Sequence, residues 1–241
     1  IASSQSVYAQ VSDVVIFNGW KNEPNFNSNG IYIVRIDRKS LFEKYDEIIS
    51  CIRKCLRLNI VITDVECFND SDFQAYEKVL SSFAKEIELL YLEGYTPQLN
   101  LLTDRIMLDS MNNCNAGFES VTLAPDCSFY ICPAFYLIGE KEEFDLGKLK
   151  FDVGSLDKGL NVKNMQLYKL SNAPLCRNCD AYQCKRCVWL NRKTTLEVNT
   201  PSREQCVIAH LERNASRSLL MSIRKHGAFL PQKEDIKKIA Y

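Results

Sequence analysis

Residues 31–63 read IYIVRIDRKSLFEKYDEIISCIRKCLRLNIVIT and contain two short apolar runs with a different pattern between them. The runs IYIVRI (31–36) and LNIVIT (58–63) are typical of strands buried in a sheet. Between them, from position 41 to position 56, apolar residues recur at helical spacing, as on one face of an amphipathic helix. A strand, a helix and a strand in this order predict a right-handed crossover in a parallel sheet.

The same alternation extends to both sides of this segment. Residues 13–17 (DVVIF) form another apolar run, positions 73–91 mark a second amphipathic helix stopped by a glycine, and residues 98–102 resemble a further strand. We therefore expect part of a barrel or an open α/β sheet. Polar residues follow the strands at positions where α/β sites often form, although helix caps and turns explain them more simply: Asp64, Glu66, Asp104 and Arg105.

The pattern changes after about residue 112. Residues 119–123 and 128–132 flank the Pro-Asp turn APDC and predict a β-hairpin, and residues 162–170 are compatible with a helix. A long helix is expected from Ser202 to about His226. Ser202 and Gln205 have the spacing of a capping box, and Gly227 is a typical helix stop.

The composition limits the classes of function. The chain has 241 residues, of which 46% are hydrophobic, and its 30 Lys and Arg balance 30 Asp and Glu. Zero net charge disfavours a nucleic-acid partner, and no apolar run approaches the ~20 residues that span a membrane. Since the first residues also lack the pattern of a secretory signal, we expect a cytoplasmic protein. In such a chain, eleven cysteines indicate metal binding or redox chemistry rather than disulfide bonds.

The strongest signal is CRNCDAYQCKRC at positions 176–187, where four residues separate two CxxC pairs. A CxxC turn directs two thiolates towards one point, which suits a bound metal ion. Eight cysteines are candidate metal ligands: Cys114, Cys127, Cys132, Cys176, Cys179, Cys184, Cys187 and Cys206. A structural zinc ion and a [4Fe–4S] cluster each take four thiolates, so these residues would fill one or two sites, and the spacing does not separate iron from zinc.

Two features beside the cysteines carry a weaker signal. His210 lies one helical turn after Cys206 and would reach the same metal ion, although a surface or packing histidine is the simpler interpretation. Lys185 and Arg186 belong to a local basic patch that would attract an acidic peptide or a phosphate. We interpret this patch more simply as a solvated surface around the cysteines.

The segments CNAGFESVTLAPDCSFYICPAF (114–135) and CRNCDAYQCKRCVWLNRKTTLEVNTPSREQC (176–206) resemble the auxiliary-cluster (SPASM) extension of radical-SAM peptide maturases. Within that group, residues 179–217 are similar to the CXXX-repeat peptide maturases. The resemblance implies an α/β fold in which residues 1–111 form a fragment of a partial TIM-type, radical-SAM-like β/α barrel. A SPASM-like cysteine-rich metal-binding module with a C-terminal helix would follow in residues 112–226, and residues 227–241 would form a tail.

The resemblance also implies a division of the ligands between two clusters. One cluster would take Cys114, Cys132 and Cys187, with Cys127 as a candidate fourth ligand. The other would take the remaining four: Cys176, Cys179, Cys184 and Cys206. In this chain Cys127 stands where the family pattern has a glycine, and the CxxC set is tighter than usual, so a single, different metal site remains an alternative.

The function implied by the resemblance is maturation of a ribosomally synthesised cysteine-repeat peptide. The partners would be this cysteine-rich precursor peptide and a companion maturation protein. Radical chemistry with S-adenosylmethionine needs a CxxxCxxC cluster motif, and only Cys51 and Cys55 approach it, with Leu58 in the third place. Since both thiols suit helix packing, S-adenosylmethionine is expected only if an upstream part supplies the motif.

Two alternatives remain open. The protein would be a non-catalytic pseudo-enzyme or partner that binds the precursor peptide while its cysteines hold structural zinc. A zinc-ribbon nucleic-acid binder is the less favoured version, because the chain lacks a basic excess.

Overall fold

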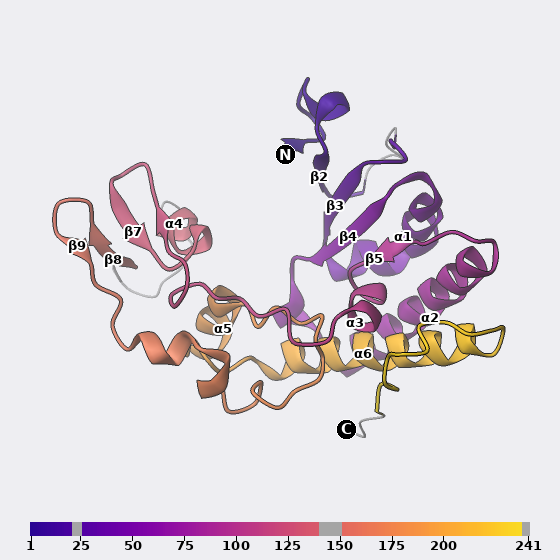
Figure 1. The fold of residues 1–241 in the computed structure, drawn as a ribbon. Coiled ribbons are helices and arrows are strands. Elements are labelled where there is room, and N and C mark those ends of the chain that lie inside the picture. The colour runs from indigo at the N-terminus through magenta and orange to yellow at the C-terminus, as the bar shows by residue number, and fades with distance from the viewer. Residues whose placement is uncertain (21–25, 140–150, 238–241) are drawn as a thin grey trace. The chain divides into compact units, whose positions relative to one another are not determined.

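The computed structural model describes residues 1–20, 26–139 and 151–237 and divides into two compact units (Figure 1). The first unit comprises Ile1–Met111, Ala181–Gln183 and Arg203–Tyr241. The second unit comprises Asn112–Asp180 and Cys184–Ser202. Three residues of the cysteine-rich segment therefore belong to the first unit, while the cysteines on either side of them belong to the second.

A parallel sheet forms the centre of the first unit. Its strands pair in chain order: β1 (Ala2–Ser3), β2 (Val14–Asn18), β3 (Ile31–Ile36), β4 (Arg57–Ile62) and β5 (Gln98–Leu99). The predicted α/β class is confirmed. In the described part of the chain the sheet is open, with β1 and β5 at its two edges.

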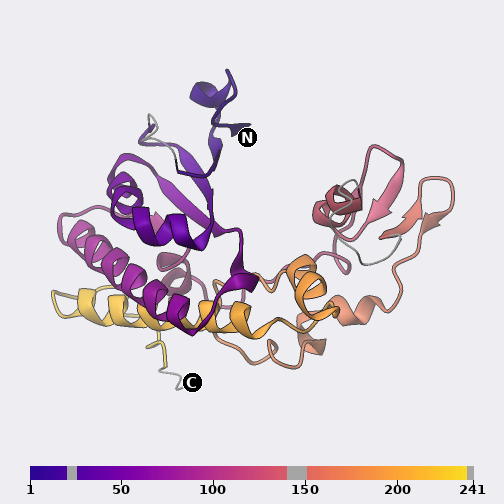
Figure 2. The ribbon, with the colours of Figure 1, turned by 180° about the vertical axis from the view of Figure 1, so that it is seen from behind.

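Helices connect the central strands. α1 (Arg38–Ser50) joins β3 to β4, and α2 (Asp70–Leu92) joins β4 to β5. Figure 2 shows α1 lying across one face of the sheet. The 3-10 turns of this unit are Ala9–Val11 before β2, Cys51–Lys54 after α1 and Val65–Cys67 before α2. Both crossovers expected from the sequence are thus present.

The core explains why the strands appear as apolar runs in the sequence. Val34 and Leu58 are fully buried on the neighbouring strands β3 and β4, and Leu41 and Ile48 of α1 are fully buried as well. These side chains belong to one continuous cluster of buried residues. Burial of this apolar surface is the main stabilising contribution to the first unit.

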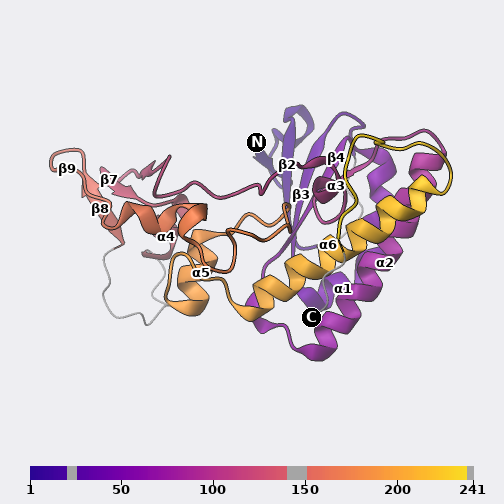
Figure 3. The same ribbon diagram turned by 60° about the horizontal axis from the view of Figure 1, so that its bottom comes forward.

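The long C-terminal helix α6 (Arg203–Arg224) also belongs to the first unit. It lies alongside α2, as Figure 3 shows, and it contacts the short helix α3 (Thr103–Met107). Its apolar side chains Ile208, Leu219 and Ile223 are buried in the core of this unit. The module expected at residues 112–226 included this helix, whereas the structure assigns it to the α/β part because its apolar face packs there.

Residues after α6 fold back onto the same unit. The guanidinium group of Arg224 donates hydrogen bonds to the backbone carbonyls of Phe229, Leu230 and Lys233. Ile236 is buried in the core. The tail expected at residues 227–241 is therefore packed as far as the structure describes it.

The second unit contains a small antiparallel sheet. Its strands pair in the order β6 (Thr122–Leu123), β7 (Ser128–Tyr130), β8 (Asp152–Ser155) and β9 (Gly159–Leu160). The pairing of β6 with β7 confirms the predicted hairpin. Two helices, α4 (Pro133–Gly139) and α5 (Val188–Thr195), complete the unit. Its core contains Phe135 and Val188, and the ring of Trp189 meets that of Phe135 edge-on at 5.0 Å.

Two predicted elements differ from the structure. The 3-10 turns Met165–Tyr168 and Leu170–Asn172 replace the single helix expected at 162–170. Asn164 before the first turn has a left-handed backbone with φ of 49°, and Lys169 between the two turns is extended with ψ of 144°. The strand expected at 98–102 ends at Leu99. There the hydroxyl of Thr103 accepts a hydrogen bond from the Leu99 amide and donates one to its carbonyl, which turns the chain into α3.

Candidate functional site

All eleven cysteines lie in the described part of the chain, and none of them forms a disulfide bond. Among the described residues, no three His, Cys, Asp or Glu side chains gather closely enough to form a metal-binding group. Electrostatic interactions nevertheless connect thiols of the second unit that are far apart in the sequence. These thiols form two groups, each of which contains part of the CRNCDAYQCKRC segment.

The first thiol group consists of Cys114, Cys132 and Cys187. Burial raises the pKa of Cys132, and the electrostatic effects of Cys187 and Cys114 raise it further, while amide groups of α4 lower it. Burial raises the pKa of Cys187, which is also raised by Cys114. These mutual effects indicate that the three thiols interact electrostatically across the sequence.

Local structure explains how Cys187 is held. It is the N-cap of α5, and its sulfur accepts a hydrogen bond from the Leu190 amide at 3.5 Å. The preceding segment is tied to Cys114 by a 2.8 Å backbone hydrogen bond from the Cys114 amide to the Lys185 carbonyl. Amide donors near a thiol favour its thiolate form, which is the form that binds metals.

The second thiol group consists of Cys176, Cys179 and Cys184. The Cys179 amide donates a 3.0 Å hydrogen bond to the Cys176 carbonyl, so the first CxxC pair forms a tight turn. Burial raises the pKa of Cys176, Arg186 lowers it, and Cys179 raises it. Cys184 is linked to this group through its electrostatic interaction with Arg186.

Arg186 interacts electrostatically with thiols of both groups and is fully buried, with an exposed fraction of 0%. Its Nε donates to Oδ1 of Asn113 at 2.7 Å, and its Nη2 donates to the carbonyls of Tyr168 and Cys114. Burial lowers the pKa of Arg186, whereas Cys176, Cys114 and Cys184 raise it. The interpretation of Arg186 as part of a solvated basic patch is therefore wrong, although Lys185 beside it is exposed.

The donor set of the second unit consists of sulfur atoms, with amide donors and a buried cation near them. The chain matches no protein-family model and no curated protein. No helix in the described ranges is long and apolar enough to span a membrane. By its chemistry, a set of thiols around a buried guanidinium suits a thiolate-bound zinc ion or an iron–sulfur cluster, both of which carry negative charge on their sulfur ligands.

The other two candidate ligands lie apart from these groups. Cys127 is exposed in the turn between β6 and β7, where its backbone is left-handed with φ of 62°. Cys206 lies near the start of α6 in the first unit, and His210 follows it by one helical turn on the same helix.

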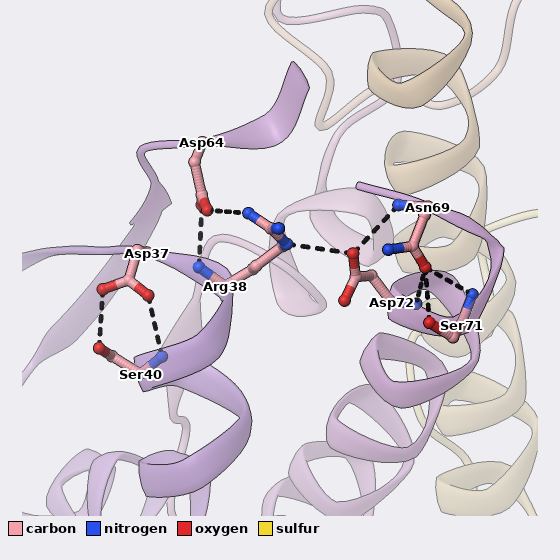
Figure 4. A network of polar contacts seen from close by, with 7 residues as sticks. All are labelled: Asp37, Arg38, Ser40, Asp64, Asn69, Ser71 and Asp72. Atoms are coloured by element: carbon pink, nitrogen blue, oxygen red, sulfur yellow. Dashed lines mark hydrogen bonds and ion pairs between the residues drawn. The ribbon is translucent and has the colours of Figure 1, made fainter. Parts of the chain in front are cut away.

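The strand-end residues have structural partners. Asp64 accepts hydrogen bonds from the Arg38 amide at 2.8 Å and from the Arg38 guanidinium, which also donates to Asp72 at 3.0 Å (Figure 4). Asp104 pairs with Arg57 at 2.6 Å. Arg105 is buried and stacks over the ring of Tyr182, 4.3 Å from its centroid. The simpler interpretation was helix caps and turns; the structure instead shows ion pairs for Asp64 and Asp104 and ring stacking for Arg105.

Sequence reasoning missed one buried acid. Glu212 of α6 has an exposed fraction of 9%, and burial raises its pKa to about 7. It contacts Gln183, one of the three residues of the cysteine-rich segment that pack in the first unit. Nothing in the sequence distinguishes this glutamate from others on a long amphipathic helix. Its environment depends on contacts with residues that are distant in the chain.

Proposed function

We propose that this protein binds metal through its cysteines and takes part in the maturation of a cysteine-rich ribosomally synthesised peptide. The second unit would hold one or two [4Fe–4S] clusters in a SPASM-like module. One observation carries the proposal: a fully buried arginine of the second unit interacts electrostatically with Cys114 and with two thiols of the distant CxxC segment. Inert packing cysteines would not need a charged group beside them.

The ligands would divide as the resemblance implies. Cys114, Cys132 and Cys187 would hold one centre with Cys127 as the candidate fourth ligand. Cys176, Cys179 and Cys184 of the second unit would contribute to the other. A bound iron–sulfur cluster supplies an electron-transfer centre, and an iron atom with an open position supplies a site for a peptide thiolate. The chain's own contribution would be to orient the thiols through the CxxC turn and the N-terminus of α5.

The α/β unit would correspond to the partial, radical-SAM-like barrel. Its five-stranded parallel sheet supports this assignment at the level of fold class. Cys51 and Cys55 are buried in the core of that unit, so they are unsuited to the CxxxCxxC role. S-adenosylmethionine chemistry therefore enters the proposal only if a CxxxCxxC segment accompanies this chain. The absence of disulfides among the eleven cysteines supports a reducing, cytoplasmic setting.

Metal analysis of three variants tests the proposal. The protein is purified without oxygen, and its iron, sulfide and zinc are measured together with its absorbance near 400 nm. We expect iron and sulfide in the native protein and their loss in Cys176→Ala and Cys184→Ala, with unfolding of the second unit. Cys51→Ala is the control, and it should keep its metal because its thiol packs in the other core. Equal metal contents in all three variants would exclude the proposed ligands.

A second function is favoured by the small antiparallel sheet of the second unit. In this version zinc stiffens the unit, and the precursor peptide adds as an extended strand along the sheet edge. A colourless protein with stoichiometric zinc that still binds a cysteine-repeat peptide would support this partner role. A brown protein would favour the iron–sulfur version.

A further inference from the structure

The charge of Arg186 is compensated differently from the charges of Arg38, Arg53 and Arg57 in the first unit. Arg186 is completely buried, yet no Asp or Glu of the described residues forms an ion pair with it. Arg38, Arg53 and Arg57 of the first unit each pair with a carboxylate instead. A buried charge without a counter-ion is destabilising, so an anion near Arg186 would stabilise the fold.

The hydrogen bonds of Arg186 to the described residues leave one of its nitrogen atoms without a partner. Nε is used by the Asn113 side chain, and Nη2 is used by the carbonyls of Tyr168 and Cys114. Nη1 is buried and has no hydrogen-bond partner among the described residues. Three hydrogen bonds from Nε and Nη2 therefore fix the orientation of the planar guanidinium and leave Nη1 as the donor that remains.

The charged neighbours of Arg186 are sulfur atoms. Cys176 has the strongest electrostatic interaction with it, followed by Cys114 and Cys184. Sulfur bound to metal is anionic, and metal binding releases the thiol protons. A metal centre at the second thiol group would thus supply the anion that the buried arginine lacks.

We propose that Arg186 is a positioning residue that donates a hydrogen bond from Nη1 to a sulfur atom of the metal centre held by the second thiol group. This inference rests on the proposed function, because it needs a thiolate-bound centre there. The guanidinium stabilises negative charge on that centre. For an iron–sulfur cluster it raises the reduction potential, and for zinc it slows release of the ion.

The matched control lies in the same segment. Arg177 lies within the first CxxC pair, and Arg186 lies within the second. The side chain of Arg177 is exposed. Arg186→Met and Arg177→Met therefore remove the same side chain beside the same group of thiols, once from a buried site and once from the surface. Arg186→Lys keeps the charge but lacks the planar fork that reaches Asn113 and the two carbonyls.

The experiment compares the four proteins after anaerobic purification, with metal content and far-ultraviolet circular dichroism measured first. If they contain iron–sulfur clusters, their midpoint potentials are measured by redox titration. Arg186→Met should favour the oxidised cluster by about tenfold, a fall of ~59 mV for a one-electron couple. The midpoint potential of Arg186→Lys should shift in the same direction, favouring the oxidised cluster by roughly threefold, because lysine keeps the charge without the directed hydrogen bond. Arg177→Met should match the native protein.

If the proteins contain zinc, the rate of zinc transfer to a chelator is measured instead. We expect the fastest transfer from Arg186→Met, a smaller increase for Arg186→Lys, and the native rate for Arg177→Met. Should Arg186→Met fail to fold, Arg186→Lys decides the result against Arg177→Met. Potentials or release rates in the Arg186 variants that equal those of Arg177→Met would overturn the inference while leaving the proposed function intact. A native protein with neither iron nor zinc would instead overturn the proposed function, and this inference with it.

Discussion

The hydroxyl of Tyr76 on α2 donates a 2.8 Å hydrogen bond to Oε1 of Glu212 on α6, joining two residues 136 positions apart. On the other side of the carboxyl group, Nε2 of Gln183 lies 3.3 Å from Oε2 and also donates to the Ala209 carbonyl at 2.7 Å. Burial raises the pKa of Glu212 to about 7, the two hydrogen bonds lower it, and Asp104 raises it. The first unit thus contains an acid that titrates near neutral pH.

This acid should make the stability of the first unit depend on pH. The folded-state pKa of Glu212 lies above its ordinary value of 4.5, so the folded protein binds the proton more tightly than the unfolded chain. The resulting stabilisation is complete below about pH 4.5 and is lost as the pH rises through about 7. Over that range the contribution of Glu212 to the free energy of unfolding should fall by up to ~3 kcal/mol.

Glu212→Gln removes this contribution, because an amide does not titrate in that range. Urea unfolding at pH 5, 6, 7 and 8 should show the variant gaining stability relative to the native protein as the pH rises. The Tyr76 hydroxyl can turn to accept a bond from the new amide. Glu77→Gln, an exposed position on α2, serves as the control and should give a difference that is constant with pH. A constant difference for Glu212→Gln as well would contradict the buried-acid interpretation.

The contacts of Arg38 predict a stabilising role at the carboxyl ends of β3 and β4. Arg38 holds Asp64 and Asp72 together, and all three side chains are largely buried (Figure 4). Arg38→Met would leave two carboxylates facing each other, so we expect a loss of ~1–2 kcal/mol in the free energy of unfolding. Arg203→Met, which removes an exposed pair with Asp70, should cost less than ~0.5 kcal/mol. Chemical denaturation of both variants checks this, and equal losses would refute it.

Periodicity was sufficient to predict the α/β unit. The apolar runs at β3 and β4 and the amphipathic pattern of α1 depend only on neighbouring residues, and each of these elements appears where the pattern indicates it. The position of α6 was not predictable in this way. Its buried face is equally compatible with packing on either unit, and only the tertiary contacts with α2 and α3 decide the outcome.

The candidate site was predictable in residue type more than in arrangement. The CxxC spacing identified Cys176, Cys179, Cys184 and Cys187, but the spacing could not reveal that Arg186 between them is buried. A basic residue beside a cysteine is usually solvated. Here the backbone of Arg186 is left-handed, with φ of 44°, and its guanidinium is bound by Asn113 and by backbone carbonyls.

Thiol labelling should separate the packing cysteines from the accessible ones. Burial raises the pKa of Cys55 to about 12, with Cys51 acting in the same direction, and both side chains are buried in the first core. Cys67 and Cys127 are exposed. With iodoacetamide at pH 8, we expect Cys67, which is not a proposed metal ligand, to react at least ~100-fold faster than Cys51 and Cys55 in the native protein. Peptide mass mapping measures this, and urea should abolish the difference. Rapid native labelling of Cys55 would show that it is not a core residue.

Gly117 and Gly159 test whether close packing in the second unit limits the chain near Cys114. Both glycines have left-handed backbones, with φ of 86° and 76°. A Cβ atom at position 117 would lie 2.5 Å from the Tyr168 ring, whereas one at position 159 would meet nothing within 4 Å. Because Tyr168 also supplies a carbonyl to Arg186, its displacement would disturb the buried guanidinium.

Gly159→Ala should therefore cost only the backbone strain of about 1–2 kcal/mol, and Gly117→Ala about 2–4 kcal/mol through added overpacking. Trp189 lies in the core of the second unit, so its fluorescence during urea unfolding reports on the stability of that unit, ideally in a Trp20→Phe background. The two alanine variants carry the same change of side chain and nearly the same backbone strain. Any additional loss in the free energy of unfolding at position 117 then measures the contact with Tyr168. Identical urea midpoints for the two variants would show that this ring moves aside without cost.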